Sequence, residues 1–123
     1  MSTNIKAFFE DIAVKFTNLK LISLTTADGF PIYNDIRTHH EVDKESISAV
    51  SSSLISLSNA AAKQLIGSTL EAVTIETQEG NMFLCNTEYK GKKCVLCVAT
   101  GIQNNIGHAR YFTQQVAKQL ITQ

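Results

Sequence analysis

The spacing of apolar residues along the chain predicts three helices. Between residues 4 and 17 large apolar side chains recur three or four positions apart, which places them on one face of a helix. The same spacing returns over residues 43–66. A third helix follows residue 105, with one face made by Ile106, Ala109, Phe112, Val116, Ala117 and Leu120.

Short polar residues and glycine mark the ends of these helices. Asp43 is a candidate N-cap, because its carboxylate can accept from free N–H groups of the first turn. Val42 and Ile47 flank it with the spacing of a hydrophobic staple, and Gly67 is a natural stop. The candidates at the other ends are Ser2, Thr3 or Asn4 and then Asn18 for the first helix, and Asn104 or Asn105 for the last.

Five segments rich in apolar and β-branched residues predict strands, over residues 19–26, 30–36, 70–77, 81–87 and 93–100. Asp28-Gly29, Gly80 and the stretch from Tyr89 to Lys92 supply turns. Strands joined by such short turns are antiparallel. Pro31 lacks an N–H group, so its strand should lie at an edge of the sheet.

The resulting order is α-β-β-α-β-β-β-α, which predicts an α+β fold. Helices should cover the faces of a five-stranded antiparallel sheet, in one domain over residues 1–123. The 123 residues are 44% hydrophobic, which is enough to build a core.

The second helix carries two stripes. One consists of large and apolar residues and is expected to pack on the domain's own sheet; its members are Ile47, Val50, Leu54, Leu57, Ala61 and Leu65. The other contains only small residues, which allow close approach of a second helix; its members are Ala49, Ser53, Ser56 and Ala60.

The second helix also lacks charge from Ser46 to Ala62. A helix with one face in water normally carries charge there, so this one is expected to be covered on a second side by another copy of the chain. The alternative is a solvated helix rich in serine and alanine. Val73 and Ile75 on the third strand would join the same dimer interface, since an edge strand can pair with its copy.

The outer flanks of the paired helices are the candidate surface for a further protein partner. Ile55, Asn59 and Ile66 are its main candidates, within the set Glu45, Ser52, Ile55, Asn59, Lys63 and Ile66. The alternative is that the two isoleucines pack under the first or the last helix.

Charge argues against two classes of partner. Eleven basic and eleven acidic residues balance, so neither nucleic acid nor an anionic membrane finds a basic surface. Lys90, Lys92 and Lys93 are interpreted as a solvated hairpin turn. The sequence begins without the pattern of a signal peptide and contains no long apolar span, so a cytoplasmic location is expected.

Residues that could carry chemistry do not combine into a site. Cys94 and Cys97 match Cys-x-x-Cys, but within a strand they would point to opposite faces, whereas Cys85 and Cys94 could share one. His39-His40-Glu41 lacks the remaining ligands of a metal site. No activated serine and no phosphate-binding loop is found. We therefore expect no catalytic residues, no cofactor, no metal and no disulfide.

Taken together, these segments resemble the roadblock/dynein light chain family. The resemblance lies in residues 21–32 with their Asp-Gly turn, in the helix rich in alanine and serine, in Gly91-Lys92-Lys93, and in residues 105–110. It implies a roadblock-like, profilin-like layered fold and a homo- or heterodimer through the second helix and third strand. Family members are non-enzymatic platforms that bind small Ras-like GTPases or attach cargo to motor complexes.

Two other functions compete with that of a dimeric scaffold or GTPase regulator. A small-molecule sensor of the PAS or GAF kind also uses a five-stranded sheet, but it needs a pocket with convergent polar groups. A small enzyme needs an acid, base or nucleophile set that is not found. Measurement of molecular size together with a ligand screen would separate scaffold from sensor.

Overall fold

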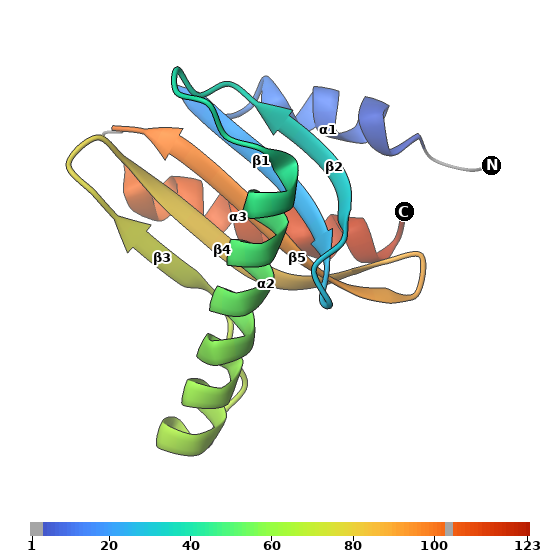
Figure 1. Cartoon of the computed structure of the whole chain (residues 1–123), viewed down its shortest axis with the longest axis vertical. Coiled ribbons are helices and arrows are strands. Elements are labelled where there is room, and N and C mark those ends of the chain that lie inside the picture. Colours follow the sequence, from blue (N-terminus) through green and yellow to red (C-terminus); the bar gives the residue numbers. More distant parts are fainter. Residues whose placement is uncertain (1–3, 103–104) are drawn as a thin grey trace.

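The computed structural model describes residues 4–102 and 105–123 (Figure 1). Its elements are α1 (Ile5–Ala13), β1 (Leu19–Thr26), β2 (Pro31–Ile36), α2 (Lys44–Ala61), η1 (Ala62–Ile66), β3 (Val73–Glu76), β4 (Gly80–Tyr89), β5 (Lys92–Gly101) and α3 (Ile106–Ile121). The predicted order is confirmed, with a π-helical turn, η1, added at the end of α2. Within the described residues no helix has the length and apolar character needed to cross a membrane.

The five strands form one antiparallel sheet in the order β2-β1-β5-β4-β3, which confirms the α+β prediction. In the centre, Cys97 of β5 lies opposite Ser23 of β1 and Leu84 of β4. Pro31 lies on β2, an edge strand, as expected. The β1–β2 turn uses Gly29 with φ 100°, a conformation that glycine adopts without steric cost.

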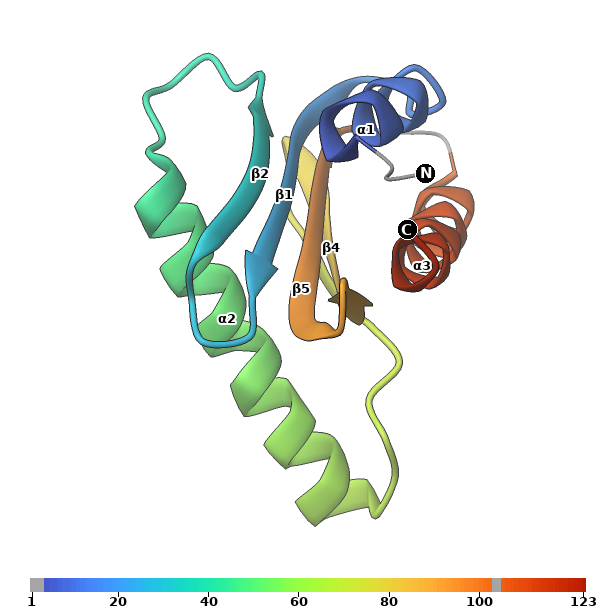
Figure 2. The same ribbon diagram turned by 90° about the vertical axis from the view of Figure 1, so that its right-hand side faces the viewer.

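The sheet separates two layers whose hydrophobic cores differ in size (Figure 2). α1 and α3 cover one face, and a large core of buried residues, centred on Phe9, Ile22 and Leu96, lies beneath them. α2 alone crosses the other face. The core on that side is smaller and consists of Leu21, Ile47, Ile55, Leu84, Val95 and Cys97.

The first helix is shorter than predicted. Asn4 caps it by accepting from the Lys6 N–H at 2.9 Å, but the helix ends at Ala13 instead of near residue 17. The turn that follows keeps Phe16 buried, and Asn18 at φ 57° ends it before β1. Asn105 caps α3. The other cap candidates, Ser2, Thr3 and Asn104, lie outside the described residues.

The third strand is also shorter than predicted. It begins at Val73 instead of residue 70 and pairs only with residues 81–84 of β4. Gly67, at φ 77°, ends the preceding helical turn as expected. The stretch from 68 to 72 must then return the chain from the end of η1 to the sheet, so it connects instead of pairing.

Substitution of Gly80 tests how closely β4 and β5 approach each other at this position. A Cβ atom at this position would meet the backbone carbonyl oxygen of Thr100 on the paired strand, and backbone cannot move aside as a side chain can. We expect Gly80→Ala to lower the free energy of unfolding by about 1–3 kcal/mol. In Gly107→Ala, the matched control, the new methyl group makes ordinary contacts, so stability should stay equal or rise slightly. Urea denaturation measures both; equal stabilities for the two variants would contradict this account of Gly80.

Candidate self-association surface

The start of α2 is built as the sequence predicts. The Asp43 carboxylate accepts from the Ser46 backbone N–H at 2.8 Å and from the Ser46 hydroxyl at 3.1 Å. These hydrogen bonds stabilise the charged form and lower the pKa of Asp43. Val42 and Ile47 both belong to the apolar cluster beneath α2. The cap and the packing of Val42 and Ile47 therefore fix where α2 begins relative to the sheet.

The side of α2 that faces its own sheet is not the predicted one. The buried residues of the helix are Ile47, Ser48, Ser51 and Ile55. Of the stripe expected to pack on the sheet, Ile47 is buried and Leu54 half-buried, but Val50, Leu57, Ala61 and Leu65 are exposed. The prediction for this stripe was wrong because the helix has two apolar faces, and helical spacing alone does not say which one meets the sheet.

Hydroxyl groups explain the observed orientation. On β1, the side chains of Ser23 and Thr25 are buried on the face that α2 covers. The Thr25 hydroxyl lies 3.0 Å from that of Ser48 and 3.4 Å from that of Ser23. Buried hydroxyls need such partners, because an unpaired one costs about 1–3 kcal/mol. Two serines of α2 therefore pack where large apolar residues were expected.

The opposite side of α2 is an apolar surface without charge. Val50 is 52% exposed and Leu57 is 72% exposed. Between them lie the predicted small residues, of which Ala49, Ser53 and Ser56 are exposed and Ala60 is half-buried. A shallow hollow of about 340 Å³ follows this surface, lined by Ala49, Val50, Ser53, Leu54 and Leu57. We call these residues, with Ser56 and Ala60, the outer face of α2.

One edge of the sheet is formed by β3. β3 pairs with β4 on one side and is last in the strand order. Its residues Val73 and Ile75 are half-buried and pack against the cluster under α2. Val73 and Ile75 therefore lie on the same side of the sheet as α2.

The three candidate residues for a further partner have different surroundings. Ile55 is only 3% exposed and packs in the core under α2, so its predicted exposure is wrong. It packs on the sheet, not under the first or last helix. Asn59 is half-buried and exchanges two hydrogen bonds, of 2.8 and 3.2 Å, with Asn86 of β4. Ile66 is 79% exposed at the end of η1.

The chemical candidates are separated by the fold. Cys94 faces the α1 and α3 side together with Cys85, whereas Cys97 faces α2, as the strand pattern predicts. Burial raises the pKa of Cys97 to about 12, although a hydrogen bond with the Ser51 side chain opposes that rise. His39 and His40 are exposed in the loop before α2. Among the described residues, no three His, Cys, Asp or Glu side chains lie close enough together to hold a metal ion.

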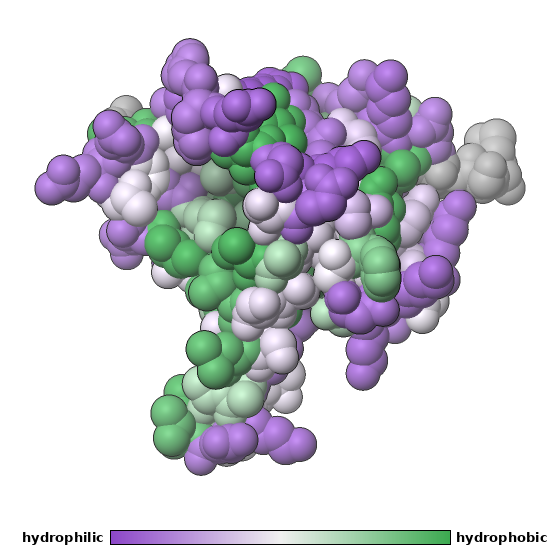
Figure 3. Space-filling view, viewed as in Figure 1, coloured by the Kyte–Doolittle hydropathy of each residue, from purple (hydrophilic) through white to green (hydrophobic). Residues whose placement is uncertain are grey.

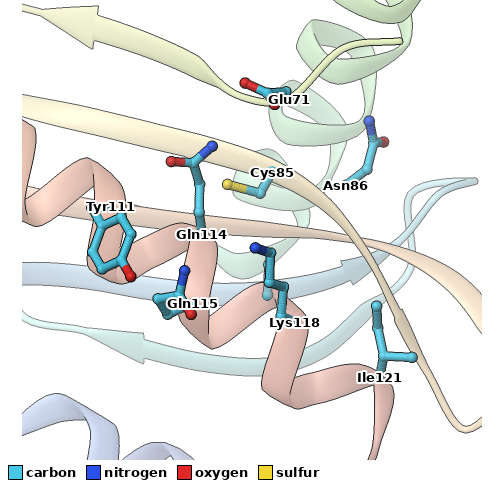
Figure 4. Close-up of a pocket in the computed structure, with 9 residues that line it drawn as sticks. Glu71, Cys85, Asn86, Tyr111, Gln114, Gln115, Lys118 and Ile121 are labelled. Carbon is cyan, nitrogen blue, oxygen red and sulfur yellow. The ribbon is translucent and has the colours of Figure 1, made fainter.

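A polar groove of about 400 Å³ lies on the other layer, between α3 and β4 (Figure 4). Figure 4 shows Gln114 and Lys118 of α3 beside Cys85, with Glu71 across from them. Burial raises the pKa of Cys85 to about 11, so its thiol stays protonated and weakly nucleophilic at neutral pH. The groove therefore offers polar contacts but no activated nucleophile at this cysteine.

Val50 and Leu57 are the interface candidates that the helical pattern missed. They were assigned to the domain's own core because they are large and apolar. A signal for the correct assignment was present in β1, where Ser23 and Thr25 alternate with apolar residues. A strand face that carries hydroxyls is matched better by Ser48 and Ser51 than by valine and leucine.

The chain was compared with known proteins. The model of the Roadblock/LC7 domain family matches residues 13–100, well over half of the chain. No match was found among curated proteins.

Solved structures share the fold at low sequence identity. MglB of Myxococcus xanthus is 19% identical with a TM-score of 0.71, over 85% of this chain and 82% of that chain. A Roadblock/LC7 domain from Streptomyces avermitilis is 18% identical with a TM-score of 0.74, over 95% and 94%. The gliding protein MglB of Thermus thermophilus is 11% identical with a TM-score of 0.76, over 99% and 91%.

The buried thiol of Cys97 should make stability depend on alkaline pH. In the unfolded chain the thiol ionises near its ordinary pKa of 9.0, whereas the folded protein keeps it protonated up to about 12. The free energy of unfolding should therefore fall as pH rises above about 9, by at most about 1.4 kcal/mol per pH unit for this group. Urea denaturation at several pH values measures this, and Cys97→Ala should reduce the slope.

Val95→Ala is the matched control, because Val95 is buried in the same cluster and does not titrate. It should lower stability by a similar amount at every pH. If Cys97→Ala and Val95→Ala show the same pH slope as the unaltered chain, the buried thiol does not contribute to it.

Proposed function

Since this chain belongs to the Roadblock/LC7 domain family, we propose that it is a non-enzymatic dimeric platform for a protein partner, with a Ras-like small GTPase as the partner class. A component of a signalling or motility complex is the wider class within which such a partner falls.

One observation carries the proposal: α2 presents an apolar, charge-free surface on the side that faces away from its own sheet. Val50 and Leu57 are more than half exposed there, which is unusual for two large apolar residues on the same side of one helix. The small residues between them permit close approach of a second helix. The proposed dimer interface is thus Ala49, Val50, Ser53, Ser56, Leu57 and Ala60, with Val73 and Ile75 near the β3 edge.

A second copy suits this surface better than water does. Helix and edge strand would be covered together, because two-fold symmetry places the same patch of each copy against the other. Pairing of β3 with its copy would satisfy the backbone groups along that edge. One similar structure is described as MglB with a tetrameric arrangement, which supports self-association as a property of this fold.

The charge balance of the chain favours a protein as the partner. Acidic and basic residues balance over the chain, so neither phosphates nor anionic lipid find a basic surface. The Thermus relative is described as a gliding protein, which supports a role in motility. Asn59 and Ile66 stay candidates for contact with the partner, whereas the burial of Ile55 removes it.

The dimer is tested by placing charge in the proposed dimer interface, and the resulting double variant is called the seam variant. Ser56→Glu with Ala60→Glu should abolish self-association, because like charges would be buried against each other. Both positions are at least partly exposed in one copy, so the variant should stay folded. Light scattering at micromolar concentration should give a dimer for the unaltered chain and a monomer for this variant.

The control adds the same two charges on the other layer. Ala7 on α1 and Gln119 on α3 are both exposed, so Ala7→Glu with Gln119→Glu should remain dimeric. A monomeric unaltered chain would refute the dimer. If the seam variant is still a dimer, the dimer interface does not include Ser56 and Ala60.

The partner is tested by affinity capture with a built-in comparison. The unaltered dimer and the seam variant are immobilised and exposed to lysate of the source organism, once with Mg²⁺ and GDP and once with a non-hydrolysable GTP analogue. We expect mass spectrometry to find a Ras-like GTPase on the dimer, in a nucleotide-dependent amount, and little on the monomer. If neither nucleotide yields a GTPase on the dimer, the proposed partner class is wrong and a dimerisation module is left.

A further inference from the structure

Only the first half of β4 has a strand on its outer side. β4 pairs with β5 along its whole length, whereas β3 pairs with residues 81–84 alone. Continued in the same register, β3 would place residues 68–72 beside residues 85–89. Residues 68–72 instead connect η1 to the sheet, and among the described residues none gives a backbone hydrogen bond to residues 85–89 from this side. We call residues 85–89 the open edge of β4.

The hairpin between β4 and β5 shows which backbone groups point outward at the open edge. Its two central residues, 90–91, have φ 51° and 80°, so Tyr89 and Lys92 form the hydrogen-bonded closing pair of a tight turn. Hydrogen-bonded and non-hydrogen-bonded pairs alternate along an antiparallel ladder. The odd-numbered residues of the open edge therefore direct their N–H and C=O groups toward β5, and Asn86 and Glu88 direct theirs outward.

The side chains of the open edge alternate between the two layers. The Thr87 hydroxyl donates to the Ala117 carbonyl of α3 at 2.5 Å, whereas the Asn86 side chain is hydrogen-bonded to Asn59 of α2. Thr87 is buried, and Asn86 and Glu88 are exposed. A strand added beside them would direct its side chains alternately toward α3 and toward α2.

Each layer has a hollow beside the open edge. On the α3 side this is the polar groove of about 400 Å³. On the α2 side a hollow of about 620 Å³ is lined in part by Ile55, Asn59 and Glu88. Asn86 and Ile121 line both hollows, so the two meet at this edge. An added strand would therefore find room for its side chains in both layers.

Lys118 gives the α3 side of the open edge its charge preference. It follows Ala117, which binds Thr87, and Figure 4 shows it between α3 and β4. Lys118 is exposed, and within the described part of the chain it forms no ion pair. A carboxylate on an added strand, opposite Thr87, would lie next to this ammonium group and be attracted to it.

Hydrophobic side chains supply little of the attraction at this edge. In the space-filling view the hydrophobic residues follow α2, and hydrophilic side chains lie at the tip of the β4–β5 hairpin (Figure 3). The unpaired backbone groups of a strand edge are instead the main attraction for an extended segment.

We propose that the open edge of β4 binds an extended, acidic segment of a partner protein as an added antiparallel strand, with a carboxylate facing Lys118. Hydrogen bonds to the N–H and C=O groups of Asn86 and Glu88 provide affinity, and the alternating side chains provide specificity. The open edge is a different stretch of backbone from the β3 edge of the proposed dimer. The inference therefore does not rest on self-association.

Two designed peptides test the charge preference. The first is Thr-Val-Glu-Val-Glu-Val-Thr, whose glutamates share one face, and the second has lysine in place of both glutamates. Each carries an N-terminal fluorescein and a C-terminal amide. Fluorescence anisotropy should show that the chain binds the glutamate peptide at least about tenfold more tightly than the lysine peptide. Lys118→Glu should reverse this preference, because it reverses the charge that faces the peptide.

Substitution of Asn86 tests the backbone contribution. Asn86→Pro removes the outward N–H group, so it should weaken binding of the glutamate peptide at least about tenfold. Asn86→Ala is the matched control: it loses the same side-chain hydrogen bonds with Asn59 but keeps the N–H group, and it should bind like the unaltered chain.

Amide hydrogen exchange of the unaltered chain gives a second readout if circular dichroism shows that Asn86→Pro is unfolded. The N–H groups of Asn86 and Glu88 should exchange fast in the free chain and more slowly with the glutamate peptide. The N–H group of Thr87 should exchange slowly in both, because it points to β5.

The remaining outcomes overturn the proposal. These are no binding of the glutamate peptide, equal binding of both peptides, the same preference in Lys118→Glu, equal weakening by Asn86→Pro and Asn86→Ala, and no change in exchange at Asn86 and Glu88. Light scattering adds one more: if Asn86→Pro loses self-association and Asn86→Ala does not, a second copy occupies the edge. Whether the unaltered chain is a monomer or a dimer decides the proposed dimer alone.

Discussion

The contact between the hydroxyls of Ser48 and Thr25 sets the rotation of α2 about its own axis, and the character of this molecule's surface follows from that rotation. Both groups are buried, so the free energy of an unpaired hydroxyl favours the orientation in which they meet. With Ser48 and Ser51 turned toward the sheet, Val50 and Leu57 are turned away from it. The helix therefore buries Ser48 and Ser51 beside Ile47 and Ile55, and it exposes Val50 and Leu57.

This orientation divides the protein into two unequal layers. Beneath α1 and α3 the aromatic and aliphatic residues around Phe9 and Leu96 form a large core. Under α2 the core is small and lies between one helix and the middle strands. A layer with so little buried apolar surface and so much exposed apolar surface gains stability when something else covers it. The course of α2 adds to this, because its last turns project beyond the sheet and no residue of η1 is buried (Figures 1 and 2).

The sheet also decides what the reactive side chains can do. Alternation along β5 places Cys94 and Cys97 in different layers, three residues apart and on opposite sides of a strand. Burial raises the pKa of both thiols, so neither is a thiolate at neutral pH. The two cysteines, which the sequence suggests as candidates for chemistry, are therefore core residues. Val50 and Leu57, which the sequence suggests as core residues, are instead exposed.

Local patterns in the sequence determined most of the fold, because helix caps, turn residues and apolar spacing act over a few residues. The bounds of β1, the Asp43 cap, the stop at Gly67 and the edge position of Pro31 all follow from such short-range rules. The small-residue stripe of α2 could likewise be read from its spacing. Only the tertiary structure decided which side of α2 meets the sheet, that Ile55 is buried while Ile66 is exposed, and that the last turns of the helix project beyond the sheet. These depend on contacts between residues far apart in the chain, such as Thr25 with Ser48 and Asn59 with Asn86, and a helical period contains no information about its partner.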